Sequence, residues 1–286
     1  MSPASKSQVH MKSAPSCAPE TYAEIARILY AKTGINLPAD NGSLVVSRLV
    51  KHLRALHLSD FESYLRWVGQ PEHSDDLNTM ISSLTTNTTR FYREPYHFDI
   101  FVEQQLPELM RKAKNGERIR LWSAGCSSGE EPYSLAATLL YHWPDVANYD
   151  VRILATDICA PALQTAESGR YPKGRLDAVP EPIRKLMLAE AHENDEMFTM
   201  PQAVRQLITV RYLNFMEPWP TKGPFQTIFC RNVAIYMDDK VQLTIWSGLI
   251  DLLPPQGLLF IGHSERLPPS QTDRVKLIDR TTFRRG

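Results

Sequence analysis

The stretch from Ile119 to Tyr141 constrains the fold of this chain more than any other part of the sequence. It opens with an apolar run, continues through the small residues SAGCS, and then reads SGEEP. Leu135, Leu139 and Leu140 follow at helical spacing. Pro132 suits the first helical position, because its missing N–H is not needed there. The pattern predicts a strand, a glycine turn and a helix, the unit that opens a nucleotide-binding α/β sheet.

The residues of this turn also indicate which ligand it suits. The glycine spacing departs from the G-x-G-x-x-G of dinucleotide-binding folds. Glu130 and Glu131 would repel a phosphate group at the start of the helix. Carboxylates there favour a neutral or cationic ligand that carries sugar hydroxyls. An ordinary tight turn between strand and helix is the alternative interpretation.

The composition excludes several classes of protein. The 286 residues include 32 basic and 32 acidic ones, so the formal net charge is +0 and no global field points to nucleic acid or membrane. The four cysteines form no CxxC pair and no cluster with histidine, so we expect no metal site and no disulfide framework. The N-terminus lacks the apolar core of a signal peptide, and no run approaches the ~20 apolar residues that span a bilayer. We therefore expect a soluble, cytoplasmic protein without direct membrane insertion.

Changes of pattern along the chain predict two domains. Residues 1–18 are rich in Ser, Pro, Ala and Lys and are predicted to be a disordered tail. Apolar stripes at helical spacing over 19–84 predict an all-α domain, and 85–96 is a polar linker. Residues 97–286 alternate strands with helices, which is typical of an α/β domain. Within it, about 171–213 breaks the alternation and is predicted to form a small antiparallel β insert.

Periodicity also predicts individual elements. One helix is expected over Tyr96–Met110, and another over Pro180–His192 within the insert. Short strands over 197–200, 203–207 and 208–213 would complete the insert as a meander. A final hairpin is expected to pair 275–278 with 281–285.

The helix predicted over Leu44–Leu56 has one apolar face and one basic face. Arg48, Lys51 and Arg54 lie on the basic face, and no acidic residue occurs from 42 to 58. A solvated helix face is one interpretation. A docking surface for an acidic partner helix is the other.

The polar linker carries an unusual run of side chains, TTNTTRFYRE at 85–94. Its hydroxyl and amide side chains suit neither a helix interior nor a core strand. Phe91 and Tyr92 beside two arginines indicate that the segment packs down. We expect it to contribute to a ligand site at the junction of the two domains.

Polar side chains also gather where the predicted strands end. They are Asp157 near the end of the strand at 151–158, Arg231 and Asn232 at the end of that at 225–232, and His263 and Glu265 just after that at 258–262. Open α/β sheets bind their ligands at the carboxyl edge of the strands. In dinucleotide-binding folds an acid at the place of Asp157 binds ribose hydroxyls, although such a residue can also simply cap the next helix.

Five stretches of the chain together resemble a known family. They are TTNTTRFYRE (85–94), WSAGCSSGEEPYS (122–134), ATDI (155–158), FCRNVAIYMD (229–238) and GLLFIGHSE (257–265). In this order they are similar to the signatures of the chemotaxis-receptor glutamate methyltransferases, the CheR family. The resemblance spans about 20–286. It implies an all-α N-terminal domain, followed by a Rossmann-like class I S-adenosylmethionine (SAM)-dependent methyltransferase domain with a small antiparallel β insert.

The resemblance also implies an activity in signal transduction. The enzyme would transfer a methyl group from SAM to glutamate side chains of methyl-accepting chemotaxis proteins during adaptation. The products would be glutamate methyl esters and S-adenosylhomocysteine. The partners would be the glutamate-rich cytoplasmic methylation helices of these receptors, which gives Arg48, Lys51 and Arg54 an acidic surface to dock on.

Carried over position by position, the resemblance implies a set of site residues. The cofactor-binding set is Asn87, Thr89 and Arg93 in the linker, Ala124, Gly125 and Glu131 at the glycine turn, Asp157 for the ribose, and Asn214, Phe215, Arg231 and Asn232 around the adenine and the methionine part. Arg93 and Tyr236 are our hypothesis for the catalytic pair that orients the substrate carboxylate.

One part of the chain departs from the family pattern. Some members dock a pentapeptide at the receptor's C-terminus through a glycine-containing loop of the insert. Here the corresponding loop, 188–196, is acidic and contains no glycine. Pentapeptide tethering is therefore not expected, and we expect recognition mainly through the helical domain.

The implied chemistry needs few catalytic groups. A glutamate carboxylate, with a pKa of about 4.3, is already ionised at neutral pH, so methyl transfer to it needs no general base. A NAD-dependent oxidoreductase on the same sheet, with His263 as its acid–base group, is the first alternative. A non-catalytic module that only senses the cofactor is the second. The neutral charge and the lack of a basic and aromatic stripe disfavour a nucleic-acid methyltransferase.

Overall fold

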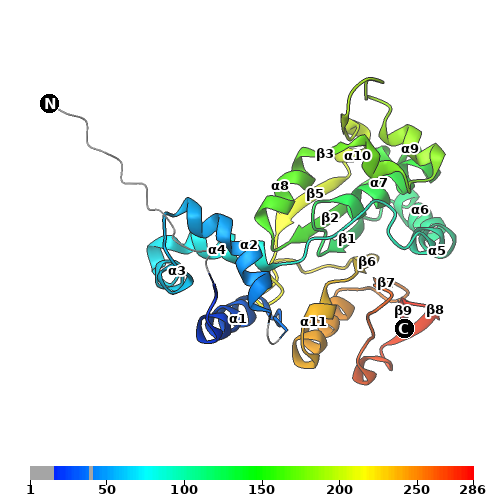
Figure 1. Cartoon of the computed structure of the whole chain (residues 1–286). Helices are drawn as coiled ribbons and strands as arrows, with labels where there is room; N and C mark the ends of the chain where they lie inside the picture. Colours follow the sequence, from blue (N-terminus) through cyan, green and yellow to red (C-terminus); the bar gives the residue numbers. More distant parts are fainter. Residues whose placement is uncertain (1–15, 39–40) are drawn as a thin grey trace. The chain divides into compact units, whose positions relative to one another are not determined.

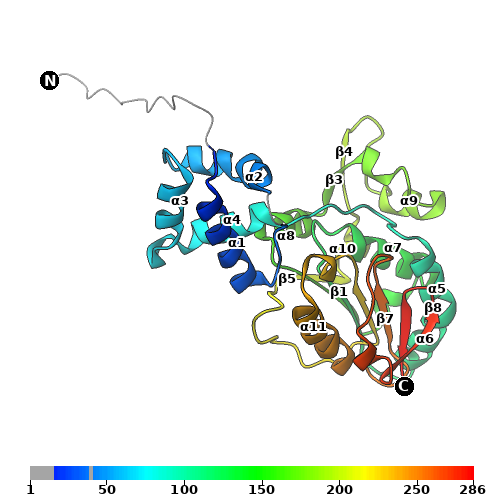
Figure 2. The ribbon, with the colours of Figure 1, turned by 60° about the horizontal axis from the view of Figure 1, so that its bottom comes forward.

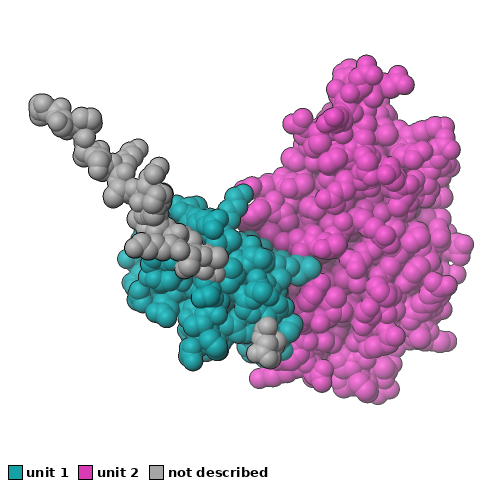
Figure 3. Space-filling view, in the orientation of Figure 1, with its two compact units in different colours: residues 1–86 teal, residues 87–286 magenta. Residues whose placement is uncertain are grey.

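A computed structural model describes residues 16–38 and 41–286 of the chain. The chain divides into two compact units, 1–86 and 87–286, which Figure 3 colours separately. The boundary falls inside the predicted linker, so most of that linker belongs to the second unit. The predicted tail over 1–18 lies mostly outside the described residues. Within the described ranges, no helix is both long and apolar enough to cross a membrane.

The regular elements of the first unit, over its described residues 16–38 and 41–86, are helices. Its elements are α1 (Pro19–Thr33), α2 (Gly42–Ala55), α3 (Phe61–Val68), η1 (Pro71–His73) and α4 (Ser74–Leu84). The apolar stripes predicted from periodicity form its core, where Ile25, Leu29, Val45, Leu49 and Leu53 are fully buried. Asp60 caps α3, because its side chain accepts a hydrogen bond from the backbone N–H of Ser63 at 2.7 Å.

The second unit alternates strands and helices. Its strands are β1 (Ile119–Ala124), β2 (Val151–Asp157), β3 (Arg170–Pro172), β4 (Met197–Thr199), β5 (Ile208–Tyr212), β6 (Thr227–Cys230), β7 (Leu258–Ile261), β8 (Val275–Asp279) and β9 (Thr282–Arg285). Its α-helices are α5 (Tyr96–Gln104), α6 (Leu106–Lys114), α7 (Glu130–His142), α8 (Ala160–Ser168), α9 (Glu181–Met187), α10 (Gln202–Arg205) and α11 (Asp239–Asp251). Short 3₁₀ turns are η2 (Val146–Asn148), η3 (Lys173–Leu176), η4 (Ala234–Tyr236) and η5 (Pro269–Gln271).

Seven of these strands form one sheet, in the order β5-β2-β1-β6-β7-β9-β8. The first five are parallel, and β9 and β8 run antiparallel to their neighbours as the predicted C-terminal hairpin. Helices α7 and α8 pack on β1, β2 and β5, whereas α11 covers the opposite face (Figures 1 and 2). After β1 the chain adds β2 and β5 on one side of that strand, and then β6 and β7 on the other side. Ligands of such sheets bind where the order switches sides, at the carboxyl ends of the strands, so we expect the ligand beside β1. The predicted Rossmann-like class I sheet is confirmed.

The predicted insert is smaller than expected and partly wrong. Only β3 and β4 form a separate antiparallel pair. The segment 208–213 instead contains β5, which pairs in parallel with β2 at the edge of the main sheet, and 203–207 is mostly α10 rather than a strand. Short apolar runs show that a segment is buried, but they do not show which sheet it joins.

Two proline positions also differ from expectation. The helix predicted over Tyr96–Met110 is divided into α5 and α6 at Gln105, because Pro107 cannot donate an N–H to the preceding turn. The side chain of Gln105 is buried there and donates to the carbonyl of Gln226 at 3.1 Å. Pro132 occupies the third position of α7 rather than the first, and the preceding glutamates begin the helix.

Candidate active site

The glycine turn joins the central strand β1 to α7. Gly125 has a left-handed backbone (φ 87°), and its N–H donates to the carbonyl of Thr156 on β2 at 2.8 Å. A Cβ atom at this position would collide with the side chain of Val233. Gly129 (φ 97°) is equally enclosed, since a Cβ there would lie 2.7 Å from the hydroxyl of Tyr171. Both glycines are therefore required by conformation and by space.

Asp157 fastens this turn to the end of β2. One carboxylate oxygen accepts the backbone N–H of Ser127 at 2.7 Å, and the other accepts that of Cys159 at 2.9 Å. Burial raises the pKa of Asp157, and the backbone donors offset part of that rise. The residue lies where the sequence predicted it, at the tip of the strand next to the glycine turn.

Glu131 lies at the start of α7, the helix that follows β1, whereas Asp157 ends the neighbouring strand β2. Its carboxylate accepts a hydrogen bond from Ser123 at 2.6 Å and lies 3.5 Å from the guanidinium of Arg231. Burial raises the pKa of Glu131, although Arg231 acts in the opposite direction. The side chain of Arg231 is only 2% exposed, and it also donates to the carbonyl of Arg93. Arg231 thus braces the tips of the strands from within.

Glu94 is a central residue of the site that the sequence reasoning missed. It is buried with a left-handed backbone (φ 56°), and its carboxylate lies 3.8 Å from Arg231 and 2.8 Å from Nδ1 of His263. Burial would raise the pKa of Glu94, but Arg231 and His263 outweigh it and lower the value. The neighbouring His97 is fully buried, and its burial lowers its pKa to about 3. The sequence did contain a sign of its importance, because Glu94 is an acid that directly follows the basic and aromatic run RFYR.

The part of the polar linker that belongs to the second unit, here called the polar loop (87–94), packs on the glycine turn of the same unit. The carbonyl of Asn87 accepts a hydrogen bond from Ser127 at 2.9 Å, and its side-chain amide donates to the sulfur of Cys159 at 3.1 Å. Arg93 is half-buried and donates to the carbonyl of Thr88 at 3.0 Å. The carbonyl of Thr89 accepts from Arg175 at 3.4 Å. Asn87 is therefore brought to the tips of β1 and β2, whereas Thr89 contacts η3 and the Arg93 side chain contacts its own loop.

The segment after β6 is held by Glu265. The Glu265 carboxylate accepts four backbone N–H groups, from Gly262 at 2.6 Å, Asn232 at 2.8 Å, Val233 at 3.0 Å and Ala234 at 2.8 Å. Burial raises the pKa of Glu265, and these donors counteract the rise. The sequence grouped Glu265 with ligand-facing side chains, but both of its oxygens are engaged in holding the backbone. It thereby fixes the loop that leads to Tyr236 in η4.

Asn214 and Phe215 follow β5, on the other side of β2. Oδ1 of Asn214 accepts the N–H of Met216 at 3.0 Å, and its amide donates to Glu217 at 3.2 Å. The indole N–H of Trp219 donates to the carbonyl of Phe215 at 3.2 Å, and the two rings contact each other edge to face. Both residues lie in a turn whose shape is set by its own polar side chains.

The predicted docking residues behave differently from one another within the helical unit. The guanidinium of Arg48 donates to the carbonyls of Leu84 at 2.7 Å and Thr85 at 2.9 Å, at the C-terminal end of α4. Arg48 is half-buried and engaged in its own unit, so its guanidinium is less free for docking than a fully exposed side chain would be. Lys51 and Arg54 are exposed.

The residues at the strand tips fit SAM. Oδ1 of Asn232 is buried, and no other atom of the described residues forms a hydrogen bond with it. The glycine turn leaves room for close approach, and its carboxylates suit a cationic sulfonium compound rather than a pyrophosphate. Over 16–38 and 41–286, no group of three or more His, Cys, Asp or Glu side chains is arranged to hold a metal ion.

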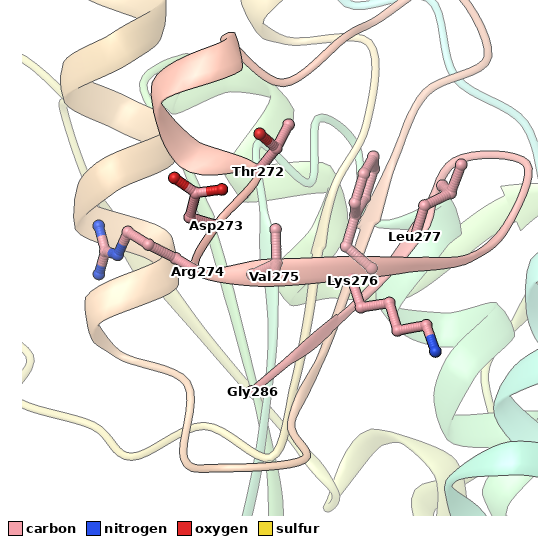
Figure 4. A pocket seen from close by; sticks show the side chains of 8 residues that line it. Thr272, Asp273, Arg274, Val275, Lys276, Leu277 and Gly286 are labelled. Carbon is pink, nitrogen blue, oxygen red and sulfur yellow. The ribbon is translucent and has the colours of Figure 1, made fainter.

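A separate hollow of about 470 Å³ lies beside the β8–β9 hairpin (Figure 4). Thr272–Leu277, Phe283 and Gly286 line it. None of the predicted site residues is among them, and the hairpin forms the edge of the sheet beyond β7. The candidate site at the strand tips is therefore separate from this hollow.

Both units match family descriptions. Residues 20–85 match "CheR methyltransferase, all-alpha domain", and residues 87–284 match "CheR methyltransferase, SAM binding domain". The chain belongs to the CheR methyltransferase family. The SAM cofactor and the methyltransferase fold expected from the sequence are confirmed, and the NAD-dependent alternative has no support.

Relatives cover nearly the whole chain. A probable chemotaxis protein methyltransferase of Rhizobium etli is 44% identical over 258 residues, which are 90% of this chain and 96% of that protein. Chemotaxis protein methyltransferase 2 of Pseudomonas aeruginosa is 36% identical, covering 86% of each chain. The chemotaxis protein methyltransferase of Escherichia coli is 35% identical, over 85% of this chain and 83% of that protein.

Proposed function

We propose that this CheR-family enzyme methylates glutamate side chains on the cytoplasmic methylation helices of chemotaxis receptors. The products are glutamate methyl esters and S-adenosylhomocysteine. The observation that carries the proposal is the 44% identity, over almost the full length of both chains, to a probable chemotaxis protein methyltransferase. Glutamate as the acceptor rests on the resemblance of the five sequence motifs.

The roles of the site residues are part of the proposal. Asp157 binds the ribose, Glu131 and the glycine turn hold the middle of the cofactor, and Asn214, Phe215, Arg231 and Asn232 flank its two ends. Asn87, Thr89 and Arg93 close over it from the polar loop. Their convergence on the tips of β1, β2 and β6 supports these roles.

The chemistry depends on alignment. When bound, SAM supplies an electrophilic methyl group, and the substrate carboxylate is already an anion. Alignment of the two reactants can remove about 7–11 kcal/mol of a barrier. Charge disappears in the transition state, so the protein should orient the carboxylate without stabilising it strongly. Arg93, held by Thr88, and Tyr236, on the loop fixed by Glu265, are the orienting pair.

Substrate recognition in the proposal uses the helical unit. Lys51 and Arg54 offer an exposed basic patch to the acidic receptor helices, whereas the half-buried Arg48 donates to backbone carbonyls at the end of α4. Pentapeptide tethering through the acidic loop at 188–196 is not part of the proposal.

The decisive experiment uses methyl-labelled SAM and purified cytoplasmic fragments of candidate receptors. We expect label on the receptor that is released as methanol by mild alkali, because methyl esters hydrolyse readily and methylated amines do not. Receptor fragments with the modified glutamates changed to alanine are the control. Alkali-stable label, or no transfer to any receptor, would overturn the proposal.

Tyr236→Phe tests the orienting pair. The hydroxyl is lost while the aromatic ring stays, so kcat should fall at least about tenfold while the dissociation constant of SAM changes less than about twofold. Isothermal titration with SAM, in the absence of receptor, supplies the second quantity. An equal loss of turnover and cofactor affinity would refute the role of Tyr236.

A further inference from the structure

Two acidic and two basic residues, in alternation, connect the cofactor side of the strand tips to solvent. Glu131 at the start of α7 lies 3.5 Å from Arg231 after β6, and Arg231 lies 3.8 Å from Glu94. Glu94 in turn lies 2.8 Å from His263, which follows β7. The first three side chains are 13%, 2% and 9% exposed, whereas the side chain of His263 is 63% exposed. Of these four residues, His263 is therefore the one that is largely open to solvent.

Glu94 fixes the orientation of the His263 ring. The same carboxylate oxygen contacts Nδ1 at 2.8 Å and accepts the backbone N–H of His263 at 3.3 Å. A carboxylate below its usual pKa accepts hydrogen bonds only, so Nδ1 carries the proton. Nε2 is then the outer nitrogen, and no residue of the described chain forms a hydrogen bond with it. The neighbouring Gly262 packs against Asn232, since a Cβ there would lie 2.7 Å from the Asn232 side chain, so His263 follows a residue that adjoins the start of the loop carrying Tyr236.

We propose that Nε2 of His263 binds the carboxylate of the incoming glutamate side chain, an inference that rests on the proposed function. Nε2 takes up a proton from solvent when the substrate binds, so that the imidazolium donates to the Glu94 carboxylate through Nδ1 and to the substrate carboxylate through Nε2. One oxygen of the substrate is held by His263, and the other attacks. The reaction forms the O–CH₃ bond and breaks the S–CH₃ bond, the electron pair stays on sulfur, and no proton is transferred. Glu94 is the positioning residue behind His263.

A single hydrogen bond to one oxygen should act mainly on substrate binding. The interaction exists before methyl transfer begins and weakens as the carboxylate loses its charge, so it lowers KM more than it raises kcat. Loss of a charge-assisted hydrogen bond corresponds to about a tenfold change or more. Among the described residues, no hydrogen bond or ion pair joins His263 directly to the glycine turn or to Asp157, so cofactor affinity should depend little on it.

The test compares His263→Ala, His263→Gln and the control His142→Ala, whose histidine is exposed at the far end of α7. We expect His263→Ala to raise the KM for a receptor fragment about tenfold, with kcat within about threefold and SAM affinity within about twofold. His263→Gln should recover part of the loss, because its amide can donate to the carboxylate. The affinity of the fragment for the enzyme loaded with S-adenosylhomocysteine, measured by titration, should weaken in parallel.

The outcomes separate this inference from the proposed function. An unchanged receptor KM in His263→Ala, with normal methylation by the wild type, overturns the role of His263 and leaves the proposed function intact. Parallel loss of SAM affinity and receptor binding also overturns it, because that result indicates a structural role. Failure of the wild-type enzyme to methylate or bind any receptor fragment overturns the proposed function and this inference with it.

Discussion

Tyr92, Glu94, Ser127 and Asn232 share an uncommon backbone conformation at the candidate site. Their φ values are 52°, 56°, 51° and 59°, a left-handed region that residues with a Cβ atom rarely adopt. Specific hydrogen bonds hold these residues in place. For example, the N–H of Tyr92 donates to the hydroxyl of Ser134 at 3.0 Å, and the N–H of Ser127 donates to the carboxylate of Asp157 at 2.7 Å. Such conformations persist only where the surroundings enforce them. The site is therefore rigidly shaped before a ligand arrives.

Gly125→Ala and Gly116→Ala form a matched pair that separates backbone strain from close packing. Both glycines have positive φ, but a Cβ at Gly116 meets nothing within 4 Å, whereas one at Gly125 collides with Val233. We expect Gly116→Ala to destabilise the protein by about 1 kcal/mol and Gly125→Ala by about 2–4 kcal/mol. Urea unfolding measures both. Of the two variants, SAM binding should be lost only in Gly125→Ala. Equal losses of stability in the two variants would show that the side chain of Val233 does not crowd a Cβ at position 125.

Glu131→Gln should change how stability depends on pH. Burial raises the pKa of Glu131 in the folded state, so this group contributes stability below the ordinary carboxyl range and loses it as pH rises through the folded value. The glutamine cannot ionise, and its amide oxygen can still accept the hydrogen bond from Ser123. We therefore expect the free energy of unfolding of the variant, relative to the wild type, to increase from about pH 4.5 towards neutrality. Urea titrations at several pH values give this difference, and parallel curves would contradict the assigned direction.

At the scale of elements, the β3–β4 insert is connected to the glycine turn. Arg175 in η3 lies 3.1 Å from Glu130, whose carboxylate is 1% exposed, and it also donates to the carbonyl of Thr89. Tyr171 on β3 donates to the carbonyl of Ser128 at 2.6 Å. The insert thus holds both the turn and the polar loop, which are the two segments that surround the cofactor in the proposal.

Arg175→Met tests whether the insert supports cofactor binding. The change leaves the buried carboxylate of Glu130 without its cation, so SAM affinity should fall about threefold to tenfold. Arg175→Lys should restore most of the affinity. Lys185→Met is the control, because Lys185 lies in the same insert and, within the described ranges, pairs with the exposed Glu181 and no other acid. Titration calorimetry with SAM decides the point, and an unchanged affinity in Arg175→Met would show that the insert does not support the site.

At the scale of the whole molecule, the two units carry different parts of the proposed function. Residues 87–286 contain all of the predicted cofactor-binding residues, and residues 1–86 contain the exposed basic pair Lys51 and Arg54. Receptor binding should therefore depend on ionic strength more than cofactor binding does, because exposed charges are screened by salt.

Charge reversal at the basic pair tests this division. Lys51→Glu with Arg54→Glu should raise the receptor KM about fivefold at low salt, flatten its salt dependence, and leave SAM affinity unchanged. The same reversal at Arg27 and Arg66, which are exposed on α1 and α3, controls for net charge. If both double variants retained the wild-type KM, docking through α2 would be excluded.

The sequence alone determined the layout of this protein. Hydrophobic periodicity located the helices of the first unit, and the apolar runs with their polar ends located β1, β2, β6 and β7. The glycine turn and the strand-end residues Asp157, Arg231 and Asn232 were identified because local chemistry requires those residue types there. These features are encoded by neighbours within a few positions in the chain.

Only the tertiary structure decided which of the polar residues are free to act. Arg48 and Glu265 resemble ligand-binding residues in the sequence, yet Arg48 caps α4 and Glu265 holds four backbone N–H groups. Glu94 became central only when Arg231 and His263, more than 130 positions away in the chain, were brought beside it. The pairing of β5 with β2 was equally hidden. The physical reason is that burial and charge pairing depend on neighbours distant in sequence, which no local pattern records.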